Sequence, residues 1–157
     1  MKGVLDKVIS PTQSAFVPGR HIHDNVIAAF ETIHSIRKNS GSGAANLVLK
    51  LDISKAYHRV EWLFLKKMMA KLGFAESWVQ LILRQLAFSN LQGDPLSPYL
   101  FLLCSEGLSC LFSHADMMGF IHGVQASRNA PSVSQLLFAD DSLVFAKAEM
   151  QEVVNLK

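Results

Sequence analysis

Hydrophobic and polar positions repeat along the chain with two different periods, and these periods predict where helices and strands lie. Apolar residues recur at helical spacing in five stretches: 1–9, 25–38, 60–72, 76–87 and 98–113. Short apolar runs at 46–52, 133–139 and 142–147 are typical of strands instead. The sequence therefore predicts an α+β fold, with helices packed on one face of a small antiparallel sheet.

The helix predictions carry details that a structure can test. Asp24 is the expected N-cap of the second helix, whose predicted buried stripe is Val26, Ala29/Phe30, Ile33 and Ile36. The fifth helix, expected to be capped by Ser97, is apolar nearly all round. It should be the most buried, with a narrow polar strip of Ser105, Glu106 and Ser109. We predict no closing element in the last ten residues.

Two adjacent aspartates, Asp140 and Asp141, separate the two apolar runs at 133–139 and 142–147. This pattern predicts a β-hairpin with both carboxylates at its tip. Neighbouring carboxylates repel each other among apolar residues, and a divalent metal ion is a common way to offset their charge. No lysine or arginine lies close to the pair in sequence, since Lys147 is six residues on. The alternative is an ordinary turn, which aspartate also favours.

A third carboxylate, Asp52, ends the predicted strand 46–52, on the same strand face as Val48 and Lys50. If this strand pairs with the hairpin, Asp52, Asp140 and Asp141 meet at one end of the sheet. Carboxylates held on separate rigid elements are the ligands of two-metal phosphoryl-transfer sites. Asp52 could instead cap a following helix.

Three further residues are candidates for contacting a nucleotide. Tyr57 follows Asp52 by five positions and could place its ring against a substrate sugar, or be a buried structural tyrosine. Gln92 could hydrogen-bond an incoming nucleotide and Gly93 permits a close backbone approach, although both could belong to a plain turn. Arg20 could contact a phosphate or be an ordinary surface arginine.

The composition excludes several classes of protein. The 157 residues are 50% hydrophobic and 18% charged, which fits one domain with a core and excludes a disordered chain. The net charge of +2 is compatible with a nucleic-acid partner without requiring one. Cys104 and Cys110 lack metal-ligand spacing, and we interpret both as reduced core residues. We expect an intracellular protein of the nucleus or cytoplasm, neither secreted nor bound to a membrane.

Four motifs occur in a fixed order: Gln13–Arg20 (QSAFVPGR), Leu51–Tyr57 (LDISKAY), Gln92–Pro98 (QGDPLSP) and Phe138–Asp141 (FADD). Together they resemble the successive motifs of reverse transcriptases of non-LTR (LINE-like) retrotransposons, a branch common in plant genomes. The FADD box alone is a weak signal, but four motifs in order are highly specific. The resemblance covers nearly the whole chain.

The resemblance implies a right-hand polymerase fold in one partial domain, with residues 46–157 as the palm and 1–45 as a remnant of the fingers. It implies that Asp52, Asp140 and Asp141 are catalytic and bind Mg²⁺ (or Mn²⁺), that Tyr57 senses the sugar, and that Gln92 and Gly93 contact the nucleotide. The implied partners are an RNA template, a DNA primer and deoxynucleoside triphosphates. The oligomeric state is left open.

The chain departs from the family pattern in three ways. His58 stands where relatives usually carry aspartate, and the stretch 84–92 is shorter than in relatives. The upstream fingers strands and a thumb are expected to be missing. We therefore expect a polymerase fragment that is inactive alone. The alternatives are a decayed element product without activity and a non-catalytic module that binds RNA or protein.

Overall fold

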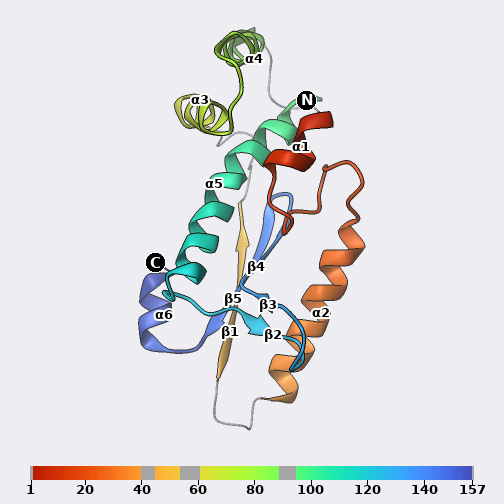
Figure 1. Cartoon of the computed structure of the whole chain (residues 1–157), viewed down its shortest axis with the longest axis vertical. Coiled ribbons are helices and arrows are strands. Elements are labelled where there is room, and N and C mark those ends of the chain that lie inside the picture. Colours follow the sequence, from red (N-terminus) through yellow and green to blue (C-terminus); the bar gives the residue numbers. More distant parts are fainter. Residues whose placement is uncertain (1, 40–44, 54–60, 89–94, 157) are drawn as a thin grey trace.

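The computed structural model describes residues 2–39, 45–53, 61–88 and 95–156. Within these ranges the chain forms six helices and five strands (Figure 1). In chain order they are α1 (Lys2–Val8), α2 (Ile22–Lys38), β1 (Asn46–Asp52), α3 (Trp62–Lys71), α4 (Glu76–Phe88), α5 (Ser97–Met117), β2 (Val124–Gln125), β3 (Ser132–Val133), β4 (Gln135–Phe138), β5 (Asp141–Lys147) and α6 (Met150–Asn155). The mixed α+β class and the five predicted helices are confirmed. None of these helices, in the ranges described, has the length and apolar character needed to span a membrane.

The central feature is an antiparallel three-stranded sheet in the order β1-β5-β4. Strand β5 pairs with β1 along all seven residues, and with β4 through a hairpin. Residues 12–14 extend this sheet at its β4 edge, because the amide of Leu137 donates to Thr12 O at 3.0 Å and Ser14 donates back to Leu137 O at 3.4 Å. The segment before α2 is thus tied to β4 close to the turn of the hairpin.

Helices cover both faces of this sheet, so the prediction of one covered face is wrong. Figure 1 shows the sheet between α2 and α5. On one face, Ala29 of α2 packs in a cluster with Leu136 and Phe145. On the other, the side chain of Gln135 donates to Ser109 O of α5 at 3.0 Å. Both faces need cover because consecutive residues of β5, whose side chains alternate between the faces, are buried from Val144 to Ala146.

A second apolar cluster joins α5 to α1, α3 and α4. Helix α3 ends at Lys71, and Gly73 follows at a φ of +85°, a left-handed conformation that suits glycine at a helix end. Helix α5 contributes more buried residues than any other described helix, as predicted, and its polar strip is among them. Glu106 accepts a hydrogen bond from the Ser10 amide at 2.8 Å. Burial raises the pKa of the Glu106 carboxyl, and this hydrogen bond offsets part of the effect.

Helix α2 differs from its prediction at its start and in its buried face. His21 occupies the N-cap position and Asp24 lies in the first helical turn, so the predicted Asp24 cap is wrong. Val26 and Phe30 are 49% and 71% exposed. The inward face is more polar than the pattern suggested, because Asn25 finds partners there: its amide donates to Thr12 O at 2.7 Å and to Leu137 O at 3.1 Å.

The C-terminal region also differs, since α6 closes the chain that was expected to lack a closing element. Its anchor is the buried carboxylate of Glu152. Glu152 accepts from the His122 amide at 3.1 Å, from the His122 ring at 2.7 Å and from the Lys147 amide at 2.9 Å. On α5, Cys104 and Cys110 are free thiols. Cys104 is partly buried, and burial raises its pKa to about 12, whereas Cys110 is exposed and so not a core residue.

Candidate functional site

The predicted acidic hairpin is present, with Ala139 and Asp140 as the two turn residues between β4 and β5. Ala139 has a φ of +55°, and Asp140 does not have a positive φ. A positive φ at the first of two turn residues alone is the pattern of a type II′ hairpin turn. Asp140 is exposed at the tip, and Asp141 is the first residue of β5. The turn therefore directs two consecutive carboxylates to one end of the sheet.

Asp52 reaches the same end of the sheet from β1. The register places Asp52 directly opposite Asp141, and the amide of Ile53 donates to Asp140 O at 3.4 Å. Directly opposed residues in an antiparallel pair lie about 5 Å apart at Cα and point to the same face. Figure 1 shows the arrowhead of β1 beside the β4–β5 turn. The predicted pairing of strand 46–52 with the hairpin is confirmed.

A cation from the neighbouring strand already contacts this acidic group. The ammonium nitrogen of Lys50 lies 2.9 Å from Asp141 Oδ1, and both side chains are about half exposed. The hydrogen bond and charge of Asp141, with smaller contributions from Asp52 and Asp140, raise the pKa of Lys50. No lysine or arginine is close to the pair in sequence, but the pairing of β1 with β5 brings Lys50 to Asp141 in the folded chain. The alternation of β1 puts Lys50 on the face of Asp52, but its contact with Asp141 depends on the β1–β5 register, which no local sequence pattern gives.

The donor set suits a hard divalent cation, because carboxylate oxygens are the preferred ligands of Mg²⁺ and Mn²⁺. The backbone positions of Asp52, Asp140 and Asp141 converge as such a site requires. In this conformation, however, no three His, Cys, Asp or Glu side chains in the described ranges are placed to hold a metal ion. Asp141 is bound to Lys50 instead. Lys50 thus occupies one oxygen of a carboxylate that the candidate site would use.

The candidate nucleotide contacts Tyr57, Gln92 and Gly93 fall within 54–60 and 89–94, outside the described residues, as does His58. They stay predictions.

Arg20, in contrast, has a clear structural role. Its guanidinium donates to Ile9 O and Gln13 O, each at 2.9 Å, and forms an ion pair with Asp6 at 3.2 Å. Its side chain is only 18% exposed. Arg20 ties the end of α1 to the following segment, so its donors are engaged within the protein rather than presented to a phosphate.

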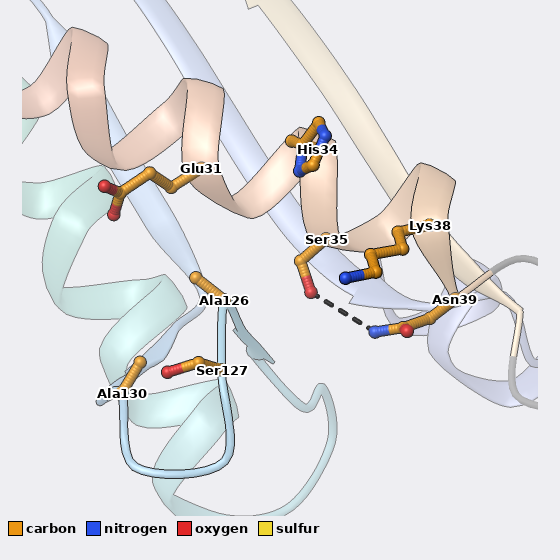
Figure 2. Close-up of a pocket in the computed structure, with 8 residues that line it drawn as sticks. All are labelled: Glu31, His34, Ser35, Lys38, Asn39, Ala126, Ser127 and Ala130. Atoms are coloured by element: carbon orange, nitrogen blue, oxygen red, sulfur yellow. Dashed lines mark hydrogen bonds between the residues drawn. The ribbon is translucent and has the colours of Figure 1, made fainter.

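A pocket of about 470 Å³ lies away from the carboxylates, between the C-terminal half of α2 and the loop that joins β2 to β3 (Figure 2). It is lined by Glu31, His34, Ser35, Lys38, Asn39, Ala126, Ser127 and Ala130. One wall is fixed by a 3.3 Å hydrogen bond from the Asn39 amide to Ser35 Oγ. Helix α2 ends beside the start of β1, whereas Asp52 ends that strand, which spans about 20 Å. The pocket is therefore separate from the acidic end of the sheet.

Comparison with known proteins adds independent observations. The sequence model of a family described as "Reverse transcriptase (RNA-dependent DNA polymerase)" matches residues 1–157. An uncharacterized mitochondrial protein of Arabidopsis thaliana is 55% identical over 51 residues, which are 32% of this chain and 42% of that protein. An uncharacterized 149 kDa protein of transposon TX1 from Xenopus laevis is 30% identical over 176 residues, covering all of this chain and 12% of that protein. The match therefore spans less than half the length of either curated relative.

The alignment with the transposon TX1 protein is longer than the chain itself, at 176 against 157 residues. That relative therefore has residues without a counterpart here. This agrees with a shortened chain, while the predicted place of the shortening, 84–92, extends into residues that the structure does not describe.

Proposed function

Because the chain belongs to the reverse transcriptase family, we propose that it is part of an RNA-directed DNA polymerase of a non-LTR retrotransposon. In this proposal the sheet and the helices of residues 46–157 form the palm, and residues 1–45 are part of the fingers. The similarity to the transposon TX1 protein over the whole chain supports the retrotransposon origin.

The reaction we propose is nucleotidyl transfer to a DNA primer on an RNA template, with deoxynucleoside triphosphates as substrates. Enzymes of this family use divalent metal ions. Asp52, Asp140 and Asp141 would hold Mg²⁺ or Mn²⁺ on two rigid strands. Bound there, such ions would supply charge that favours loss of the primer 3′-hydroxyl proton and neutralises the leaving pyrophosphate.

The single observation that carries this proposal is the β1–β5 register. Asp52 and Asp141 are 89 positions apart in the sequence and yet directly opposed, with Asp140 adjacent in the turn. A one-residue slip would move Asp52 to the other face of the sheet. The pairing therefore supports a shared cation at the strand ends.

We assign the remaining motif residues to the nucleotide. The ring of Tyr57, placed against C2′ of the sugar, would sterically exclude a 2′-hydroxyl and so favour deoxynucleotides. Gln92 would hydrogen-bond the nucleotide, and Gly93 would let the backbone approach it closely.

The proposed polymerase activity belongs to a larger protein and not to this chain by itself. A polymerase holds template and primer through phosphate contacts spread over a broad basic surface. A net charge of +2 on 157 residues offers little of such a surface. We propose that this chain is inactive alone, either as part of a larger polymerase or as the product of a decayed element.

One observation favours a second candidate, a non-catalytic module that binds another protein. The outward side of α2 exposes a stripe at helical spacing, with Ile22, Val26 and Phe30 each about half exposed or more. Light scattering tests it: association that rises with protein concentration and ignores added RNA would favour this candidate.

A Mn²⁺ titration followed by electron paramagnetic resonance tests the proposed site. We expect the wild-type chain to bind Mn²⁺ and the Asp140→Asn/Asp141→Asn double variant to bind at least about tenfold more weakly, because two of three anionic donors are neutralised. Glu31→Gln, in the separate pocket, is the matched charge control and should leave the affinity unchanged. Equal affinities in wild type and double variant would overturn the proposed site.

A further inference from the structure

A buried side-chain amide, that of Gln13, joins the segment before α2 to the acidic turn. Gln13 is 1% exposed. Its Oε1 accepts hydrogen bonds from the Ala15 amide at 3.0 Å and from the Ala139 amide at 3.2 Å. Both neighbours are N–H donors, so the oxygen of Gln13 must face them. Gln13 thus holds the first residue of the turn that carries Asp140.

Ala139 is the turn residue that most needs such a restraint. Its φ of +55° lies in the left-handed region, which is sterically unfavourable for a residue that carries a Cβ. The first position of a type II′ turn usually holds glycine, which adopts this φ without that penalty. An external hydrogen bond to the Ala139 amide stabilises the strained conformation against its alternatives.

The position of Gln13 is itself fixed by the hairpin. Leu137, two residues before the turn, exchanges backbone hydrogen bonds with Thr12 and Ser14 on either side of Gln13. The Asn25 amide closes the junction by donating to both Thr12 O and Leu137 O. These hydrogen bonds fix the backbone on both sides of Gln13 to the same hairpin that carries Ala139. The contact between Gln13 and Ala139 therefore does not depend on a mobile surface loop.

We propose that Gln13 is a positioning residue for the acidic site: its buried carbonyl oxygen holds the Ala139–Asp140 turn in the conformation that sets Asp140 and Asp141 beside Asp52. Gln13 acts through the turn and touches neither substrate nor ion. The inference rests on the proposed function in one respect, that these carboxylates bind a divalent cation. The hydrogen bond and its effect on the turn do not depend on that function.

The unmodified chain gives the first test, through amide hydrogen exchange measured by NMR. A turn amide that faces solvent exchanges close to the rate of an unfolded chain. We expect the Ala139 amide to exchange at least about tenfold more slowly than that rate, because Gln13 accepts its hydrogen bond. Exchange of the Ala139 amide at the unprotected rate would overturn the proposal.

The second test compares two glutamine substitutions of the same kind. Gln13→Met removes the acceptor and keeps the length of the side chain. Gln135→Met is the matched control, because Gln135 is also buried and its amide donates to Ser109 and Ser113 of α5, away from the turn. Both variants should lose stability. Only Gln13→Met should weaken Mn²⁺ binding, by about tenfold, the equivalent of one hydrogen bond.

Rescue separates positioning from a general loss of structure. Adding Ala139→Gly to Gln13→Met supplies a residue that adopts the positive φ unaided, so Mn²⁺ affinity should return toward the wild-type value. Wild-type affinity in Gln13→Met, or an equal loss in Gln135→Met, would overturn the proposal. If the wild type itself binds no Mn²⁺, the proposed function fails, and exchange of the Ala139 amide alone decides this inference.

Discussion

At the scale of single residues, Asp141 has two possible cationic partners. The structure pairs it with Lys50 at 2.9 Å, and the proposed function requires a divalent ion at the same carboxylate. An exposed ion pair of this kind contributes little to stability, because water and salt screen its charges. A divalent ion held by three carboxylates can displace so weak a partner. If the carboxylates bind an ion as proposed, Lys50 would compete with it for Asp141 and lower the apparent metal affinity.

Replacing Lys50 tests this competition. We expect Lys50→Met to bind Mn²⁺ up to about fivefold more tightly than wild type, the factor that corresponds to an exposed ion pair. Lys147→Met is the control. Lys147 lies on the same face of β5 as Asp141, but it is paired with Asn46 at the opposite end of the sheet. An unchanged or weaker affinity in Lys50→Met would show that Lys50 does not compete for Asp141.

The meeting of the three aspartates was predictable from the sequence. The ion pair of Asp141 with Lys50 and the hydrogen bond of the turn to Gln13 were not. Short apolar runs ending in Asp52 and flanking Asp140-Asp141 predicted one strand and a hairpin, and the register confirms that they pair. Contacts between strands depend on register, which no local sequence pattern gives, so the contact of Lys50 with Asp141 was not predicted. Gln13 carries no periodic signal either, because it lies outside regular elements and its partner Ala139 is 126 residues away.

At the scale of elements, sequence periodicity predicted long helices well and short elements poorly. The predicted helices at 60–72 and 76–87 correspond to α3 and α4 within two residues at each end. The two-residue strands β2 and β3, and the six-residue α6, are too short to show a period. For α2, the predicted stripe is partly right, since Ala29, Ile33 and Ile36 pack against the sheet cluster while Val26 and Phe30 are exposed. The rest of the buried face is polar, because Asn25 and Thr32 are satisfied by hydrogen bonds to backbone oxygens.

The docking of α6 depends on the buried carboxylate of Glu152, which gives a prediction at this scale. We expect Glu152→Ala to lower the free energy of unfolding by about 2 kcal/mol, because three hydrogen bonds from His122 and Lys147 lose their acceptor. Gln151→Ala on the exposed side of α6 should change it by less than about 0.5 kcal/mol. Urea denaturation at neutral pH measures both, and equal small effects would contradict the anchoring role.

The same carboxylate predicts a dependence on pH. Burial alone would raise the pKa of Glu152, but hydrogen bonds from the His122 ring and from two backbone amides lower it overall. A lowered folded-state pKa means that Glu152 stabilises the fold above its ordinary value of 4.5 and loses this effect as the pH falls through the folded value. The gap between wild type and Glu152→Ala in urea denaturation should therefore narrow below about pH 4.5. A gap that widens on acidification would contradict this sign.

At the scale of the whole molecule, helices cover both faces of the sheet, and the three aspartates lie together at one end of its strands. Helix α2 covers the face on which Asp52 and Asp141 lie, through contacts with Leu136 and Phe145 farther along the strands. The class α+β followed from the sequence. The cover on two faces had a signal as well, the continuous apolar run Leu143–Ala146 of β5, which is typical of a strand buried on both faces and which the prediction of one covered face did not use.

The low net charge of the whole molecule also leads to a prediction about primer extension. With an RNA template, a DNA primer and deoxynucleoside triphosphates, we expect the chain alone to give no extension above the Asp140→Asn background, because its charge provides little grip on nucleic acid. Gel analysis of a labelled primer measures this. Extension by the wild-type chain that disappears in Asp140→Asn would show that this chain is a sufficient polymerase.

The most direct measurement of the central claim is Mn²⁺-induced paramagnetic broadening of backbone amide signals in the wild-type chain. If Asp52 and the Asp140–Asp141 turn share one cation, the amides of Asp52, Ile53, Asp140 and Asp141 should broaden together, with one half-saturation concentration. Broadening confined to one of the two strands, or centred on the pocket at the C-terminal half of α2, would contradict a shared site.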